Sequence, residues 1–127
     1  MKAVLMALLV AMSFVACKKD DAKPAVSIEG KWVGKFGTGE NPPSSFYSFN
    51  IKADGTIQEL SQSGEVTGEG EWELDNNILY ATYSTVAPNV KVYTILGAFN
   101  AGQGKILGNW GYDDSATNGG LWEMTKQ

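Results

Sequence analysis

The sequence contains no histidine and no arginine, and its single cysteine is Cys17. Histidine is the usual general base and nitrogen ligand for metals, and arginine is the usual planar partner of phosphates and carboxylates. Nucleophilic triads therefore lack their base. The net charge of −4 argues against a nucleic-acid partner, which requires a cationic surface. We expect a protein that is not an enzyme, with no cofactor and no bound metal.

Carboxylates are the remaining candidates for catalysis, and they are most concentrated at Glu69, Glu71 and Glu73. Their spacing of two places them on one face of a strand. The alternate positions of the same segment carry Trp72 and Leu74, which suit a core. We therefore interpret the three glutamates as a solvent-facing acidic stripe rather than a glycosidase pair.

The first residues have the pattern of a targeting segment. Met1 and Lys2 form a short positive start, and residues 3–16 are apolar apart from Ser13. Fourteen residues in a helix span roughly 21 Å, which is short of the roughly 30 Å hydrocarbon core of a bilayer. Residues 1–16 are therefore predicted to be a signal peptide rather than a permanent membrane span.

The run Phe14-Val15-Ala16-Cys17 resembles a bacterial lipobox. The resemblance implies that the thiol of Cys17 is acylated and that the chain is cut just before it, which would anchor the protein to a membrane. The alternatives are a conventional signal peptide with a stray cysteine, and an ordinary buried thiol.

The next residues, Lys18-Lys19-Asp20-Asp21-Ala22, are similar to the export signal of surface-displayed lipoproteins. Through Lys19, Asp20 and Asp21 this resemblance implies passage to the outer leaflet of the outer membrane, with exposure at the cell surface. The alternative is a polar tether on a lipoprotein that stays at the periplasmic face. In both cases residues 17–27 are predicted to be a flexible tether, in which Pro24 discourages a helix.

Residues 28–127 are predicted to form one all-β domain, because period-two alternation and turn signals recur along them. Eight strands joined mostly by short loops favour a small antiparallel up-and-down barrel, with a β-sandwich as the alternative. Glycines on the inferred inward face, such as Gly34 and Gly108, suit the tight coiling of a small barrel. The predicted strands are 31–36, a strand through Tyr47, Phe49 and Ile51, then 56–60, 65–74, 78–83, 90–96, 105–112 and 121–125.

The segment Gly30-Lys31-Trp32, followed by Gly34, resembles the G-x-W signature that opens calycin barrels, the lipocalins and their relatives. The resemblance implies a lipocalin-like barrel in which Gly30 and Trp32 are structural and Trp32 packs across the closed end. The chain has no arginine to pack over that tryptophan, as one does in the family.

The sequence is compatible with two functions. In the first, the barrel of a lipid-anchored envelope lipoprotein binds a small apolar or amphipathic ligand. The second is a non-enzymatic interaction or structural module with a filled core, whose loops at residues 37–45 and 113–120 contact an envelope protein or a glycan. For the first function, the predicted pocket residues are Tyr47, Phe49, Trp72, Tyr80, Tyr112 and Trp122.

Overall fold

A computed structural model describes residues 25–127 of the chain, which form an all-β structure. The signal peptide at residues 1–16, the lipidation site Cys17 and the export residues Lys19, Asp20 and Asp21 lie outside the described residues and stay predictions. The eight strands are β1 (Gly30–Phe36), β2 (Ser45–Ile51), β3 (Thr56–Leu60), β4 (Val66–Asp75), β5 (Ile78–Thr85), β6 (Val92–Asn100), β7 (Lys105–Tyr112) and β8 (Gly120–Lys126).

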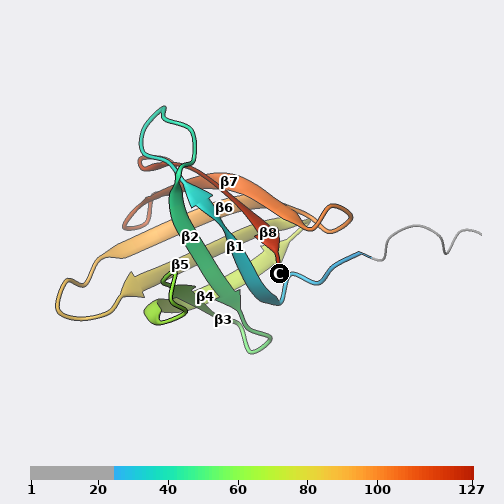
Figure 1. Cartoon of the computed structure of the whole chain (residues 1–127), viewed down its shortest axis with the longest axis horizontal. Coiled ribbons are helices and arrows are strands. Elements are labelled where there is room, and N and C mark those ends of the chain that lie inside the picture. Colours follow the sequence, from blue (N-terminus) through green and yellow to red (C-terminus); the bar gives the residue numbers. More distant parts are fainter. Residues whose placement is uncertain (1–24) are drawn as a thin grey trace, which may run out of the picture.

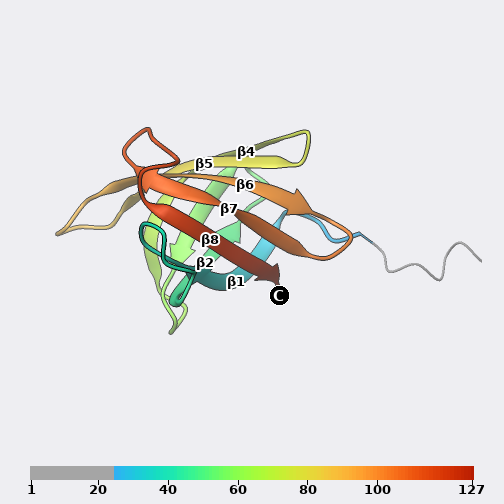
Figure 2. The same ribbon diagram turned by 90° about the horizontal axis from the view of Figure 1, so that it is seen from above.

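The strands form a meander that closes on itself (Figure 1). Each strand pairs antiparallel with the next, and β1 also pairs with β8, with Trp32 opposite Lys126 and Phe36 opposite Trp122. This confirms the predicted eight-stranded barrel and excludes the sandwich. Seen from above, the strands wrap obliquely around a common interior (Figure 2). Closure pairs both edges of the sheet, so neither β1 nor β8 is left as an open edge.

Strand bounds agree with the alternation of the sequence except in β6. The predicted strand ended at Leu96, before Gly97, whereas β6 continues to Asn100. Gly97 lies opposite Gly108, and a Cβ at Gly97 would be 2.7 Å from both Trp122 and Ile106. This glycine therefore makes room for a large neighbour within a continuous strand, as in barrels that alternate small and large interior side chains.

The hairpin between β4 and β5 determines which side chains of β5 face inward. Asn76 and Asn77 form a two-residue loop with φ values of 49° and 64°, the left-handed conformation that type I′ hairpins require. This loop pairs Leu74 with Leu79. Leu79, Ala81 and Tyr83 therefore point into the barrel, and all three are buried.

Tyr80 consequently points outward and is 40% exposed, so the expectation that it faces the interior is wrong. The physical reason is that β5 carries apolar residues on both faces, and alternation alone does not distinguish them. Glu69, Glu71 and Glu73 are exposed on the outer face of β4, as the alternation of that strand predicts.

One end of the barrel, where the chain enters β1, is closed by side chains. Trp32 is fully buried, and its indole N–H donates to the carbonyl oxygen of Ile28 at 2.8 Å. The ring of Phe99 packs edge-on against Trp32 with centroids 5.9 Å apart. The ammonium group of Lys126 lies 5.6 Å from the centre of the Trp32 ring and donates to the carbonyl oxygens of Ser27 and Glu29.

The segment before β1 also belongs to this closed end. The amide of Val26 donates to the carbonyl oxygen of Ala101 at 3.0 Å, and its side chain packs against the core. Figure 1 shows this segment beside the C-terminus. Within residues 25–127 there is no helix with the length and apolarity needed to cross a membrane.

Candidate functional site

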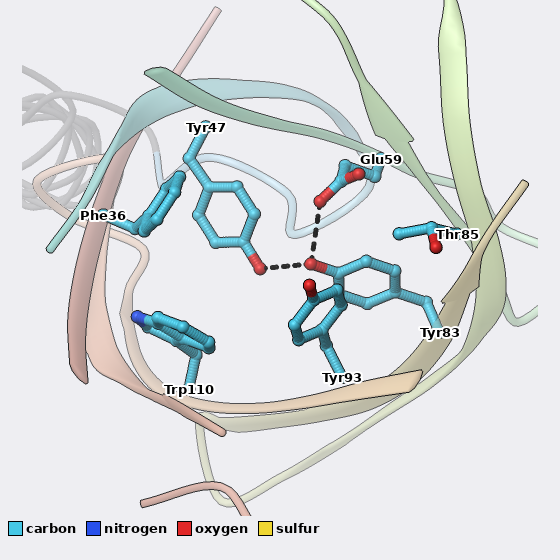
Figure 3. Close-up of a pocket in the computed structure, with 7 residues that line it drawn as sticks. All are labelled: Phe36, Tyr47, Glu59, Tyr83, Thr85, Tyr93 and Trp110. Atoms are coloured by element: carbon cyan, nitrogen blue, oxygen red, sulfur yellow. Dashed lines mark hydrogen bonds between the residues drawn. The ribbon is translucent and has the colours of Figure 1, made fainter. Parts of the chain in front are cut away.

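The opposite, open end of the barrel contains a cavity of about 160 Å³ (Figure 3). Five of its seven lining residues are aromatic, one is a carboxylate and one is a hydroxyl. The cavity is smaller than the 300–1,000 Å³ typical of ligand pockets, because buried side chains fill the rest of the interior. The lining residues are Phe36, Tyr47, Glu59, Tyr83, Thr85, Tyr93 and Trp110.

The meander brings these residues together although they are far apart in the chain. In an up-and-down barrel, the C-terminal ends of odd strands meet the N-terminal ends of even strands. Phe36, Glu59 and Trp110 lie toward the ends of β1, β3 and β7. Tyr47 and Tyr93 lie near the starts of β2 and β6. All of them lie at inward-facing positions of their strands, so their side chains meet at the open end.

A chain of hydrogen bonds crosses the cavity (Figure 3). The hydroxyl oxygens of Tyr47 and Tyr83 are 2.6 Å apart. The Tyr83 hydroxyl donates to one carboxylate oxygen of Glu59 at 2.8 Å, which makes the Tyr47 hydroxyl the donor to Tyr83. Thr67 donates to the second carboxylate oxygen of Glu59 at 2.8 Å. Tyr83 and Thr67 therefore orient the carboxylate of Glu59, and Tyr47 in turn positions the Tyr83 hydroxyl.

The electrostatics of this chain follow from burial. Removal from water raises the pKa of the Tyr83 hydroxyl far above its ordinary value of 10.0, and the neighbouring Tyr47 and Glu59 add to the increase. Burial likewise raises the pKa of Tyr47, although its hydrogen bond to Tyr83 opposes the increase. Both phenols are therefore neutral at physiological pH, and Glu59 carries the only formal charge among the lining residues.

The aromatic rings around the cavity contact one another in edge-to-face pairs, except for Tyr83 and Tyr93, whose rings are tilted by 38°. Phe36 contacts both Tyr47 and Trp110, with centroids 5.1 and 5.6 Å apart. Tyr93 contacts Trp110 at 5.9 Å and Tyr83 at 5.6 Å. The Trp110 indole N–H donates to the carbonyl oxygen of Gly37 at 2.8 Å, which ties β7 to the loop after β1. The lining is thus held by mutual contacts before any ligand binds.

Four of the six predicted pocket residues lie in or next to this region. Tyr47 lines the cavity. Phe49 and Trp122 pack beneath it, each 1% exposed, with ring centroids 4.7 and 6.3 Å from that of Tyr47. Tyr112 lies at the rim, 44% exposed, against the rings of Tyr93 and Trp110.

The other two predicted pocket residues lie elsewhere. Trp72 is near the closed end, where its indole N–H donates to the carbonyl oxygen of Lys52 in the β2–β3 turn. Tyr80 is on the outer wall. The structural role that the resemblance implied for Trp32 agrees with its burial at the closed end, and Gly30 precedes it with a φ of 124°.

Most of the lining residues were not predicted from the sequence, although two signals in it locate part of the lining. The two-residue loop at Asn76-Asn77 sets the register of β5 and thereby points Tyr83 inward. Glu59 follows Ile57 by two residues, so it shares the inward phase of a buried side chain. An acidic residue on an inward phase is a signal of a polar site, because charges are seldom buried without a purpose.

The cavity offers aromatic rings, hydroxyl groups and one carboxylate to a ligand. Among residues 25–127, no three histidine, cysteine, aspartate or glutamate side chains lie close enough together to hold a metal ion. The lining carries a single carboxylate, so a pair of carboxylates for acid and base catalysis is absent from it.

Comparisons with known proteins found no family model, no curated protein and no solved structure that matches this chain.

Proposed function

We propose that this chain is a lipid-anchored envelope lipoprotein whose lipocalin-like barrel binds a small amphipathic ligand at its open end. The observation that carries the proposal is the aromatic cavity with an oriented carboxylate at Glu59. Apolar walls with a few placed polar groups are what small-molecule sites share. A cavity of about 150 Å³ is known to accommodate benzene, so the bound group has about six to eight heavy atoms.

The partial exposure of the lining supports entry from solvent. Glu59, Thr85 and Tyr93 are each half-buried. A ligand larger than the cavity extends through the mouth, between the loops that connect the strands at this end. The lining thus selects one end of such a ligand and leaves the remainder in contact with the loops.

The lipocalin-like assignment is supported by the closed end. The first-strand tryptophan, Trp32, is buried there, as the family resemblance implies. The family's arginine has no counterpart in the sequence, but Lys126 places its ammonium group over the Trp32 ring. A cation over this tryptophan is therefore retained with a different residue.

The lipid anchor is compatible with the direction in which the barrel opens. The chain enters the barrel at the closed end through Val26 and Ile28. An anchor at Cys17 would therefore join the barrel at its closed end, and the tether would not obstruct the mouth of the cavity. This arrangement leaves the ligand site accessible to solvent.

Native mass spectrometry of the full-length protein, released from membranes in a non-ionic detergent, tests ligand binding. We expect a bound small molecule on the wild-type chain and its loss in Tyr93→Trp, which enlarges a half-buried lining residue into the cavity. Tyr80→Trp is the matched control, because it makes the same change on the outer wall. An adduct that persists equally in both variants would contradict the proposed site.

Localisation has its own test in cells. Cys17→Ala is expected to leave the protein soluble or unprocessed, and normal membrane retention of this variant would contradict the anchor. Alanine at Lys19, Asp20 and Asp21 is expected to make the barrel resistant to protease added to intact cells. Unchanged protease sensitivity would assign these residues to the tether alone.

A second candidate function, an interaction module, is favoured by the outer wall of β5 to β8. Tyr80 pairs with Leu96 across the sheet, and Ala98 pairs with both Ile78 and Leu107. The large side chains on this outer face are 39–55% exposed, namely Ile78, Tyr80, Leu96 and Leu107. Contiguous exposed apolar side chains are typical of protein contact sites. Leu107→Glu would disrupt binding of an envelope partner without altering the cavity, whereas Tyr93→Trp would not disrupt it.

A further inference from the structure

The walls of the open-end cavity are dominated by π systems. Phe36, Tyr47, Tyr83, Tyr93 and Trp110 surround it on several sides (Figure 3). The face of an aromatic ring carries negative electrostatic potential and attracts a cation within about 6 Å of the ring centre. An occupant of a cavity of about 160 Å³ is in contact with several of these rings at once.

The polar part of the lining is negatively charged, and so has the same sign as the potential at the ring faces. Glu59 carries a negative charge, and the two side chains that hydrogen-bond it, Tyr83 and Thr67, are neutral hydroxyls. An ionised carboxylate has about four acceptor positions, and these two hydrogen bonds occupy two of them. No lysine is among the lining residues. The lining therefore orients a negative charge without neutralising it.

This combination distinguishes between classes of ligand. An anion would be repelled by Glu59 and by the ring faces. A neutral apolar group would fill the space, but it would shield the carboxylate from water without compensating its charge, which is unfavourable. A cation gains from both components, because the carboxylate supplies a charge partner and the rings supply cation–π contacts.

From this geometry we infer that the cavity binds the positively charged head of a small organic amine or quaternary ammonium compound. The inference rests on the proposed function and specifies its ligand class. Glu59 is the charge partner, and Tyr83 and Thr67 hold it in position. The half-buried Tyr93 is the aromatic wall at the mouth.

Three probes of nearly equal shape and different charge test this class. Choline carries a positive charge, 3,3-dimethylbutan-1-ol is its neutral isostere, and 3,3-dimethylbutanoate is a negatively charged analogue. Each is titrated into the full-length protein in a non-ionic detergent by calorimetry. We expect choline to bind about tenfold more tightly than the neutral alcohol, and the carboxylate more weakly than both.

Substitutions test whether Glu59 and Tyr93 cause the preference for choline over the neutral alcohol. Glu59→Gln keeps an acceptor for Tyr83 and removes the charge, so it should abolish the preference for choline over the alcohol. Glu69→Gln removes one charge from the exposed face of β4 and should leave the preference unchanged. If Glu59→Gln does not fold by circular dichroism, Tyr93→Leu provides the second test. It removes one ring from the mouth and should weaken choline binding more than binding of the alcohol.

Each result separates the inference from the function on which it rests. Equal or tighter binding of the neutral alcohol, or a preference for choline that survives Glu59→Gln, would overturn the cationic ligand class and leave a ligand-binding cavity intact. Failure of all three probes to bind would contradict the cavity as a ligand site, and with it both proposals.

Discussion

The two ends of the barrel use similar residues to opposite effect. At the closed end, Trp32 is buried, its indole N–H is paired, and the chain's own Lys126 supplies a cation over the ring. At the open end, a larger set of aromatic rings surrounds a cavity and the uncompensated carboxylate of Glu59. The closed end thus contains its cation within the fold, whereas at the open end we propose that a ligand supplies the cation.

The two ends should also contribute differently to the stability of the fold. Side chains that fill the closed end stabilise the fold through burial and close packing. The open end lacks part of that packing, because it contains a cavity and a polar network. Substitutions at the two ends should therefore lower the free energy of unfolding by different amounts. The experiments below compare the two ends, from the largest expected effect to the smallest.

The largest effect is expected for Trp32→Ala. Removing a fully buried tryptophan leaves a cavity and should lower the free energy of unfolding by about 4 kcal/mol. Tyr93→Ala at the mouth removes a half-buried ring and should cost about 1 kcal/mol. Urea denaturation followed by circular dichroism measures both values. Equal costs at the two positions would remove the energetic distinction between the ends.

Added volume should be tolerated at the open end and not in the packed interior. Gly97→Ala places a methyl group 2.7 Å from Trp122 and Ile106, and should cost about 3 kcal/mol. Tyr93→Trp extends into the cavity and should cost less than about 1 kcal/mol. Thermal denaturation of the two variants compares them. A larger loss for Tyr93→Trp than for Gly97→Ala would show that the open end has no usable space.

Alkaline pH should lower the free energy of unfolding through the two buried tyrosines at the open end. Burial raises the pKa of Tyr47 and Tyr83 above the ordinary value of 10.0, so the folded chain retains protons that the unfolded chain loses. Below about pH 9, titration of these two tyrosines should therefore not change the free energy of unfolding. This free energy should fall above pH 10 by about 1.4 kcal/mol per tyrosine for each pH unit.

Urea denaturation between pH 8 and 11 measures this slope, and Tyr47→Phe serves as the control because it removes one of the two groups. A slope that is the same in wild type and Tyr47→Phe would assign the alkaline loss to other residues.

The smallest effect is expected at the closed end, for Lys126→Met. This change keeps most of the aliphatic side chain and removes the cation over Trp32 together with hydrogen bonds to Ser27 and Glu29. We expect a loss of about 1 kcal/mol, because the ammonium group is only partly shielded from solvent. Lys105→Met on the exposed start of β7 is the matched control. An equal effect in both variants would mean that the cation over Trp32 contributes nothing.

The barrel could be predicted from the sequence because its strands and turns carry local signals. The alternation of Glu69 to Leu74 sets the faces of β4, and the strands at 56–60 and 105–112 agree with the predicted bounds. Up-and-down order follows from short loops between consecutive strands. These features depend on residues that are close in the chain.

The site was less predictable because it depends on register and on depth within the barrel. Alternation identified Tyr47, Phe49 and Trp122 as inward, but it did not separate the cavity lining from the core beneath it. Tyr80 was predicted to line the pocket but lies on the outer face of β5. Trp72 was also predicted to line it but lies near the closed end. Strand register and distance along the barrel axis are long-range properties, which one strand read alone does not contain.

The four tryptophans allow ligand binding at the open end to be measured directly. Trp32 and Trp72 lie toward the closed end, Trp122 packs beneath the cavity, and Trp110 lines it. The measurement is a titration of the ¹⁵N-labelled full-length chain with choline and with 3,3-dimethylbutan-1-ol, followed through the four indole N–H signals. We predict that the Trp110 signal shifts and that the Trp32 and Trp72 signals stay in place. A shift confined to Trp32 or Trp72, or no shift of Trp110 with either probe, would contradict ligand binding at the open end.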